Sequence, residues 1–327
     1  MKYRTLGKTG YKISEISYGS WSLGADWGNV SEEQAMSVLH SAIDQGVNFI
    51  DTADVYGDGK SEQRIGKLLK QRKERIYVAT KAGRRLNPHV AEGYTKENLN
   101  AFVDRSRENL GVQTLDLLQL HCPPTSVYYN QEVFTALDEM VVKKKIRFYG
   151  VSVEKVEEGL KSIEYPNLST VQIIYNMFRQ RPAELFFEQA RKKNIGIIIR
   201  VPLASGLLSG KMTIDTNFPT NDHRNYNRQG GSFDVGETFA GIPFELGLQT
   251  VNKLKQILPR GYSMPQFALR WILEQDAVST IIPGGKHPEQ ITDNVHTCEL
   301  PRLSRDIQKK VASIYTDFVM PYVHQRW

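Results

Sequence analysis

The feature that most constrains the fold of this 327-residue chain is a repeated pairing of a short apolar run with an amphipathic helical segment. Most of these runs are rich in apolar and β-branched residues, which is typical of parallel strands buried on both faces. The predicted strands are 13–18, 47–50, 76–79, 115–120, 146–151, 170–174, 195–200 and 278–282, and the predicted helices are 35–43, 60–70, 96–110, 132–143, 155–163, 183–193 and 288–295. Eight such strands closing on themselves predict an α/β fold, a (β/α)8 TIM barrel, rather than an open sheet.

Two segments depart from this repeat. Residues 3–13 precede the first barrel strand and predict a β-hairpin that caps the bottom of the barrel. Residues 202–243 form a long loop after the seventh strand, and in a barrel such a loop lies over the C-terminal face, where active sites are built. Ser31 to Gln34 is a capping-box pattern at the first helix. No linker or low-complexity tract is present, so we expect residues 1–327 to form a single domain.

Composition narrows the class of protein. Hydrophobic residues make up 40% of the chain and charged residues 24%, as in an ordinary soluble enzyme. No apolar stretch is long enough to span a membrane, and residues 1–10 lack the apolar core of a secretory signal. Two cysteines, Cys122 and Cys298, form no disulfide framework and fit a reducing compartment. These features predict a cytoplasmic protein with no membrane partner.

The net charge of +6 does not indicate a nucleic-acid partner. The basic residues are dispersed in short runs, 70–75, 84–85 and 143–145, for which a solvated helix end or turn is the favoured interpretation. No zinc finger and no platform of arginine and aromatic residues is present. A mild positive charge suits an anionic small ligand equally well.

Two other site classes are disfavoured. No G-x-G-x-x-G follows a strand, and the glycines at 59 and 206–210 miss the P-loop spacing, so a Rossmann domain and a P-loop are not expected. Asp51, Asp54, Asp58 and His121 offer metal-ligand chemistry. Further His or Glu residues at other strand ends are sparse, however, and we expect no metal site, with Asp54 and Asp58 as loop residues.

Polar residues at three consecutive strand ends form a more specific pattern. Asp51 ends the second strand and Tyr56 lies in the following loop, while Lys81 and His121 end the third and fourth strands. Taken singly, a capping Asp, a packed Tyr, a solvated Lys and a core His are the simpler interpretations. Because the carboxyl ends of barrel strands meet at one rim, we expect the four side chains to lie together.

Together these residues form a proton-donating group. A lysine ammonium that is held by an aspartate beside a phenol favours the phenolate, which lowers the tyrosine pKa from about 10. Tyr56 would then donate a proton to a developing alkoxide near neutral pH. His121 would hydrogen-bond the substrate oxygen and orient it.

The motifs FIDTADVYG, ATKAG and LQLHCP resemble those of the aldo-keto reductase superfamily, an NADPH-using (β/α)8 barrel family, and nearly the whole chain follows its pattern. The resemblance implies that Asp51, Tyr56, Lys81 and His121 are the catalytic tetrad. The motif style is most similar to the branch of bacterial stress-type reductases and potassium-channel β-subunits.

The resemblance also implies a site for NADPH or NADP+. Its residues would lie beside the nicotinamide, along the pyrophosphate in the loop after the seventh strand, and around the adenosine 2′-phosphate and adenine after the eighth strand. Those implied by the resemblance are Gly19, Ser20, Trp21, Asp51, Ser152, Gln172, Arg200, Pro202, Leu203, Ser205, Gly206, Leu207, Ser209, Lys211, Arg224, Gly284, Lys286, Gln290 and Asn294. Phosphate at a loop that opens a helix is physically reasonable, because free N–H groups point there.

Two positions depart from the family pattern. Val153 stands where the family often has asparagine, and Arg200 stands where it usually stacks an aromatic ring on the nicotinamide. A planar guanidinium can also stack on a ring. A further prediction is an aromatic substrate pocket, for which packing residues are an equal alternative; the candidates are Trp21, Trp27, Tyr128 and residues 322–327.

These inferences predict an NADP-dependent oxidoreductase that reduces aldehydes or ketones, or oxidises the matching alcohols, by direct hydride transfer. Its partner would be a small-molecule carbonyl or alcohol, with Lys286 favouring NADP over NAD. The alternative, which rests on the resemblance to channel β-subunits, is a protein that senses NADPH and regulates a partner. The oligomeric state and the substrate stay open.

Overall fold

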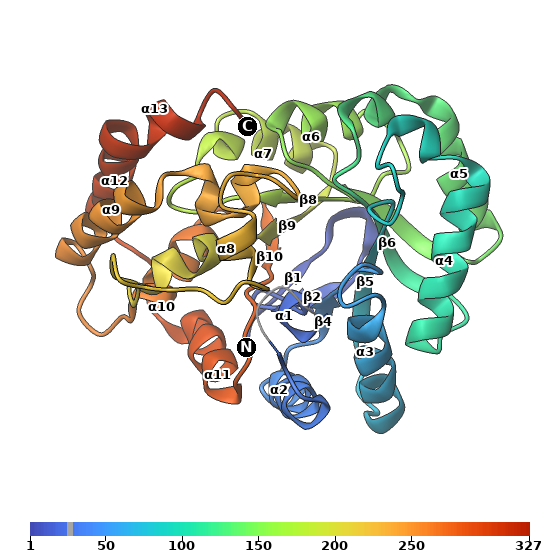
Figure 1. The fold of residues 1–327 in the computed structure, drawn as a ribbon, viewed down its shortest axis with the longest axis horizontal. Coiled ribbons are helices and arrows are strands. Elements are labelled where there is room, and N and C mark those ends of the chain that lie inside the picture. Colours follow the sequence, from blue (N-terminus) through green and yellow to red (C-terminus); the bar gives the residue numbers. More distant parts are fainter. Residues whose placement is uncertain (25–28) are drawn as a thin grey trace.

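The computed structural model describes residues 1–24 and 29–327, and its centre is an eight-stranded parallel sheet. Neighbouring strands pair in chain order from β3 to β10. The strands are β3 (Tyr18–Gly19), β4 (Phe49–Asp51), β5 (Tyr77–Ala82), β6 (Leu115–His121), β7 (Ile146–Ser152), β8 (Thr170–Ile174), β9 (Gly196–Arg200) and β10 (Val278–Ile281). Outer helices surround these strands (Figure 1).

Hydrogen bonds between the first and last segments close the sheet into a barrel. Ser17 N donates to the Ile281 carbonyl at 2.8 Å, and Ile281 N donates to the Glu15 carbonyl at 3.0 Å. Gly19 N continues the contact by donating to the Pro283 carbonyl at 3.1 Å. The predicted (β/α)8 barrel is confirmed.

The predicted hairpin is also confirmed, but the first strand was predicted in the wrong place. β1 (Tyr3–Thr5) pairs in antiparallel fashion with β2 (Lys12–Ser14), so the start of the predicted strand 13–18 belongs to the hairpin. The barrel strand itself is only Tyr18–Gly19. The hairpin places the side chains of Leu6 and Ile13 in a buried cluster with inward-facing residues of β4, β5, β6 and β9. The cap therefore fills the barrel's lower end.

All seven predicted helices are present, and the described residues contain six others, three of them only four residues long, that were not predicted. The helices are α1 (Trp21–Gly24), α2 (Glu32–Asp44), α3 (Lys60–Gln71), α4 (Lys96–Leu110), α5 (Gln131–Val142), α6 (Val156–Ser162), α7 (Phe186–Lys192), α8 (His223–Tyr226), α9 (Phe244–Gln256), α10 (Met264–Leu273), α11 (Pro288–His296), α12 (Arg305–Ile314) and α13 (Met320–Val323). The sequence did not indicate α9, α10 and α12. None of the helices in the described part of the chain meets the length and hydropathy needed to cross a bilayer.

The capping box at α2 forms only in part. The Ser31 side chain accepts a hydrogen bond from Gln34 N, as expected for an N-cap. The Gln34 side chain donates instead to the Lys286 carbonyl at 2.8 Å. This bond ties the start of α2 to the segment before α11, at the rim of the barrel.

The long segment after β9 contains only short helical turns until α9 begins. These turns are η5 (Ala204–Ser209), α8, η6 (Val235–Glu237) and η7 (Phe239–Gly241). The segment contacts the ends of the strands through several side chains, which are described below. Its polar turn-forming residues therefore build part of a site and do not form a separate layer.

Candidate active site

A cavity of about 430 Å³ lies at the carboxyl ends of the strands, as expected for a barrel of this type. Most residues predicted for the site line it. They are Gly19, Ser20, Trp21, Asp51, Tyr56, His121, Gln172, Arg200, Pro202, Leu203, Ser205, Gly206, Ser209, Lys211, Arg224, Gly284, Lys286, Gln290 and Asn294.

Three predicted residues do not line this cavity. Lys81 is 1% exposed and lies behind Asp51 and Tyr56. Ser152 is fully buried, and its carbonyl accepts a hydrogen bond from Tyr128 at 3.2 Å. Leu207 is buried in the hydrophobic core, close to Gly247 of α9. Any role of these three residues is therefore exerted through a neighbour or through the backbone.

Lys81 connects Asp51 to Tyr56. Its Nζ forms a buried ion pair with Asp51 Oδ1, donates to the Thr52 carbonyl at 2.8 Å and reaches the Tyr56 hydroxyl at 3.4 Å. Burial alone would lower the pKa of Lys81, but Asp51 and Tyr56 hold that pKa above its ordinary value. The lysine is therefore a fixed cation beside the phenol.

Two glutamines position the other oxygen of Asp51. Gln172 Nε2 donates to Asp51 Oδ2 at 2.7 Å, and Gln119 Nε2 donates to the same atom at 3.0 Å. Gln119 of β6 pairs in register with Lys81 of β5, so strand register alone places it beside the ion pair. Gln119 was not predicted as a site residue. Its position two residues before His121 puts both side chains on the inner face of the barrel, and this spacing is the signal in the sequence.

A tight turn holds Tyr56 over the cavity. Gly57 has a φ of +61°, and a Cβ there would lie 2.5 Å from the Gly24 carbonyl oxygen. Tyr56 and Gly57 thus pack directly against the end of α1, an approach that only glycine permits. Ser20 stabilises the base of the same turn by donating from its hydroxyl to the Asp51 carbonyl at 2.9 Å.

The prediction that the pKa of Tyr56 is lowered is wrong for this structure. Burial raises the pKa of the Tyr56 phenol above its ordinary value, and the nearby Lys81 offsets only part of that effect. Tyr56 therefore carries its proton throughout the physiological pH range. A protonated phenol in contact with a fixed ammonium is still suited to donate that proton.

His121 is held in its neutral form. Burial, followed by the positive charges of Arg84 and Lys81, lowers its pKa well below the ordinary value. Its ring lies edge-on to Tyr56, with centroids 6.0 Å apart. Among the described residues, Nδ1 of His121 has no hydrogen-bond partner. A neutral imidazole at this place can donate one ring N–H to an oxygen in the cavity.

Among the described residues of the predicted aromatic pocket, only Trp21 lines the cavity. Its ring stacks on Tyr56 at 6.0 Å and lies 5.9 Å from Phe233, a loop residue that the sequence did not single out. Tyr128 is a core residue and Tyr322 is exposed, so both are excluded from the cavity wall. Trp27 lies outside the described residues.

Two of the aspartates that were weighed as metal ligands, and disfavoured, are paired with cations instead. Asp51 is paired with Lys81, whereas Asp58 is exposed and pairs with Arg85 and Arg105. The Asp54 carboxyl is buried and has no hydrogen-bond partner among the described residues.

Arg200 belongs to a buried group of charges that the sequence did not indicate. Its Nη2 binds Glu154 at 2.8 Å and the Val153 carbonyl at 3.1 Å, and its Nη1 lies 3.3 Å from Glu237. Arg84 also pairs with Glu237 and lies 3.4 Å from Glu154. The prediction of a solvated residue is wrong for Arg84, whose side chain is only 18% exposed.

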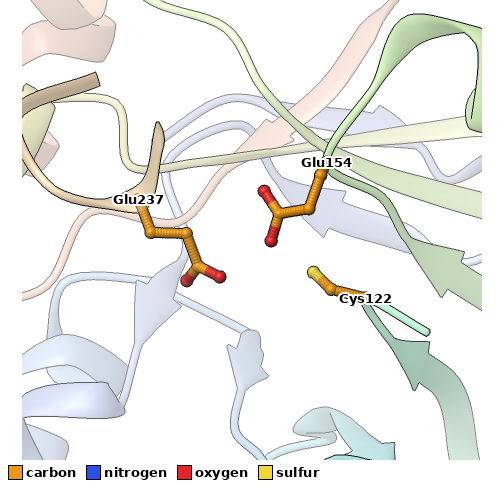
Figure 2. Close-up of side chains that lie close together, drawn as sticks. All are labelled: Cys122, Glu154 and Glu237. Atoms are coloured by element: carbon orange, nitrogen blue, oxygen red, sulfur yellow. The ribbon is translucent and has the colours of Figure 1, made fainter. Parts of the chain in front are cut away.

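The side chains of Cys122, Glu154 and Glu237 point toward one another at the strand ends (Figure 2). Their ligand atoms lie within 4.8 Å of one another, which is a spacing that a metal ion could use. However, both carboxylates are already paired with guanidinium groups, and burial raises the pKa of the Cys122 thiol. The charges of this group therefore favour an internal ion-pair network over a metal site.

The far end of the cavity carries three cations. Lys211 is exposed and Lys286 is partly buried, and neither forms an ion pair within the described residues. Arg224 forms a two-pronged ion pair with Asp222, at 2.7 and 2.9 Å. Burial lowers the pKa of Lys286. The negative charge of Asp222 opposes this shift, and the positive charge of Arg224 adds to it. This end combines positive charge with access to solvent.

The loop after β9 and the start of α11 form the cavity wall at this end. Gly206 has a φ of +93°, and a Cβ there would lie 2.9 Å from Met212 and 3.6 Å from an Arg224 nitrogen, both on the cavity wall. Gln290 caps α11 by accepting bonds from Lys286 N at 2.7 Å and His287 N at 3.2 Å. The Ser205 hydroxyl is occupied by the loop and donates to the Glu237 carbonyl at 2.9 Å. The lysine cations and the open surface at Gly206 thus fit a phosphate-bearing ligand, whereas Lys286 N and His287 N are already bonded to Gln290.

Comparison with known sequences gives a family match over most of the chain. A model of the aldo/keto reductase family matches residues 15–316. Aldo-keto reductase YhdN of Bacillus subtilis is 30% identical over 297 residues, covering 89% of this chain and 87% of that protein. An aldo-keto reductase named for NADP(+), yakc of Schizosaccharomyces pombe, is 29% identical over 86% of this chain and 83% of its own. A probable voltage-gated potassium channel subunit beta of Arabidopsis thaliana is 27% identical, with 96% of each chain covered.

Solved structures of the same fold are similar over nearly the whole chain. A glycerol dehydrogenase from Gluconobacter oxydans superposes with a TM-score of 0.80 at 28% identity, covering 97% of this chain and 96% of its own. The holo form of an aldo-keto reductase from Bacillus halodurans gives a TM-score of 0.77 at 25% identity, with 96% of each chain covered.

Proposed function

The chain belongs to the aldo/keto reductase family, and from this premise we propose that it is an NADP-dependent oxidoreductase. In this proposal it reduces an aldehyde or ketone, or oxidises the matching alcohol, with Tyr56 as the general acid. The observation that carries the proposal is the buried contact of Asp51, Lys81 and Tyr56 at the wall of the cavity. If the Asp51–Lys81 pair served only to stabilise the fold, it would not explain why the phenol of Tyr56 lies between Lys81 and the cavity.

NADPH or NADP+ is the cofactor that best fits the cavity. One relative is named for NADP(+), and the family uses this cofactor. Gln172, Arg200 and Ser20 would bind near the nicotinamide, and the loop of residues 202–211 would hold the pyrophosphate. Lys286 would bind the 2′-phosphate, because it is a cation without an ion pair among the described residues at the start of α11.

When bound, the reduced nicotinamide supplies the hydride that adds to the carbonyl carbon. Tyr56 donates its phenolic proton to the carbonyl oxygen as negative charge develops there. Lys81 stabilises the resulting phenolate, and Asp51 keeps Lys81 in place through an ion pair that the two glutamines orient. Neutral His121 donates a ring N–H to the same oxygen and thereby fixes the direction of the carbonyl group. Tyr56 regains its proton from solvent.

A second candidate function is that of a cofactor-sensing subunit, which the similarity to a channel β-subunit supports. In that case the NADPH-bound and NADP+-bound forms would differ in affinity for a partner. The buried group of Asp51, Lys81 and Tyr56 favours catalysis, because a sensor has no need of a proton donor.

Turnover separates the two functions. The purified chain with NADPH is assayed against a panel of short-chain aldehydes, aromatic aldehydes, ketones and sugars, by following the absorbance of the reduced nicotinamide. We expect reduction of at least one class, with NADPH preferred over NADH. Tight binding of NADPH without oxidation by any member of the panel would contradict the enzyme function and favour the sensor.

A further inference from the structure

We propose that Glu237 is a positioning residue of this site, whose carboxylate holds Arg200 at the end of β9 and Arg84 beyond β5 in place beside the reacting groups. The inference rests on the proposed function. It assigns a role in catalysis to the long loop after β9, which carries Glu237 and contributes none of the four residues of the tetrad.

The first support is geometric. Glu237 is 5% exposed, yet it lines the cavity together with Tyr56, His121 and Arg200. One of its oxygens pairs with Arg84 Nη2, and the other lies 3.3 Å from Arg200 Nη1. A single carboxylate thus bridges two guanidinium groups from opposite sides of the barrel rim.

Glu154 completes the group but has a different role. It pairs with the same two arginines, at 2.8 Å to Arg200 and 3.4 Å to Arg84. Burial raises the pKa of Glu154, whereas Arg84 and Arg200 outweigh burial and lower the pKa of Glu237. Glu237 also lines the cavity, whereas Glu154 lies behind it against the same two arginines.

The second support is that Glu237 is hydrogen-bonded to the loop of residues 202–211. Ser205 donates from its hydroxyl to the Glu237 carbonyl at 2.9 Å and accepts a bond from Phe239 N at 3.2 Å. Ser205 has a φ of +54°, and Phe239 has one of +53°. Left-handed backbone at two non-glycine residues persists only where the surroundings enforce it. A shift of the loop of residues 202–211 on cofactor binding would therefore be transmitted to Glu237.

The third support is that Trp327 packs against the segment that carries Glu237. Asp234 accepts a hydrogen bond from Trp327 Nε1 at 2.9 Å, and the Arg179 guanidinium lies 4.1 Å from the Trp327 ring. Trp327 is 3% exposed and fills the space under Gly236 and Gly241. The segment that carries Glu237 is thus held from both sides.

Glu237 also acts on the reacting group itself. Its negative charge contributes to the raised pKa of Tyr56, after burial and Asp51. A carboxylate far from the phenol would have no such effect, so this shift shows that the Glu237 charge reaches the reacting group. The pH dependence of the reaction therefore distinguishes a positioning role from a merely structural one.

The test compares Glu237→Gln with Glu154→Gln and with Glu245→Gln, a matched control at an exposed residue of α9. For each variant, kcat and KM are measured across pH with NADPH and an accepted aldehyde, and the Kd for NADP+ is measured by quenching of tryptophan fluorescence. For Glu237→Gln we expect kcat to fall about ten-fold or more, because small misplacements of reacting groups are costly. The Kd for NADP+ should rise several-fold.

The alkaline limb of the pH profile is the range in which kcat falls as the pH rises. In Glu237→Gln this limb should move to lower pH, because the phenol loses a neighbouring negative charge. Glu154→Gln should move this limb less, and Glu245→Gln should match the wild type. Glu237→Asp keeps the charge and serves if Glu237→Gln is poorly folded by circular dichroism; it should lower kcat and leave the limb in place.

Two results would overturn the inference. One is a kcat, limb and Kd in Glu237→Gln equal to those of the control. The other is a lower kcat with an unmoved alkaline limb, which would mark a structural role only. If the wild type binds NADP+ but does not turn over, the proposed function fails. The Kd values of the variants for NADP+ then decide whether Glu237 positions residues that bind the cofactor.

Discussion

The two ends of the cavity hold their charges in opposite ways. At the catalytic end, Asp51 and Lys81 are 2% and 1% exposed and are bound to each other and to the surrounding amides. At the far end, Lys211 and Lys286 have no ion pair among the described residues, and Lys211 is exposed. The catalytic end is complete without a ligand, whereas the far end has positive charge available for one.

This difference follows from the fold. Barrel strands place Asp51, Lys81 and Gln119 in neighbouring register positions, so their bonds form when the barrel forms. Lys211 lies in a loop, and Lys286 lies just before α11. Preorganised charge suits a transition state, because it costs no reorganisation during the reaction. Exposed cations suit reversible phosphate binding, because they are not already neutralised.

The largest expected effect is that of Lys81→Met, which breaks the buried pair. Asp51 would remain buried and charged without its counter-ion, which typically costs about 3–5 kcal/mol of stability. Activity should also fall by about 10²–10⁴-fold, since Tyr56 loses its cation. Urea unfolding and kcat measure the two effects. The double variant Asp51→Asn/Lys81→Met should regain stability but not activity. If Lys81→Met is as stable as the wild type, the charges at the catalytic end do not depend on each other, and the two ends do not differ in this way.

Asp54 is the exception at the catalytic end and gives the second prediction. Burial, with the negative charge of Glu62, raises its pKa to about 7, while Arg85 and Arg105 oppose the shift and Tyr94 lies close enough to feel its charge. A carboxyl whose pKa is raised on folding stabilises the protein below its unfolded pKa, and this stability is lost as the pH rises to about 7.

The variant Asp54→Asn should therefore gain stability relative to wild type between pH 4 and pH 8, by up to about 4 kcal/mol. Thermal or urea unfolding at both pH values measures the gain. Asp58→Asn, at an exposed and paired carboxylate, is the control. An equal difference between Asp54→Asn and wild type at both pH values would show that folding does not raise the pKa of Asp54.

At the far end, Lys286→Ala should act on the cofactor alone. Loss of one charge-assisted bond to phosphate typically costs about 1.5–3 kcal/mol, so the Kd for NADPH should rise by about one order of magnitude or more. The Kd for NADH and the urea midpoint should stay the same. Fluorescence titration with both cofactors measures this. An equal loss for NADPH and NADH would remove the assignment of the 2′-phosphate to Lys286.

The smallest expected effect is that of Arg224→Met. Because Asp222 already neutralises Arg224, the loss of NADPH affinity should be smaller than for Lys286→Ala. The same titration measures it. A loss larger than that of Lys286→Ala would reverse the ranking of the two cations.

The sequence allowed the barrel to be predicted because its information is local. Apolar runs such as Leu115–His121 mark buried parallel strands whatever surrounds them. The first strand was misplaced because Ile13 to Tyr18 reads as one strand-like run, although its first residues pair with β1. Helix α10 was missed, and its residues are buried on all sides rather than on one face.

The site was predictable only where a residue type and a strand end coincide. Asp51, Lys81 and His121 satisfy that condition, and strand register brings them to one rim. Glu237 does not, because it comes from a loop, and its contact with Arg84 joins residues 153 positions apart. The pKa of Tyr56 was predicted with the wrong sign, since the sequence does not show how deeply the phenol is buried.

The most direct test of the central claim is a single-turnover measurement with Tyr56→Phe at saturating NADPH and aldehyde. We expect oxidation of NADPH to slow by about 10²–10⁴-fold relative to wild type, with an unchanged Kd for NADPH, because Tyr56 acts on the substrate oxygen and not on the phosphates. Oxidation at the wild-type rate would contradict the role of Tyr56 as the proton donor.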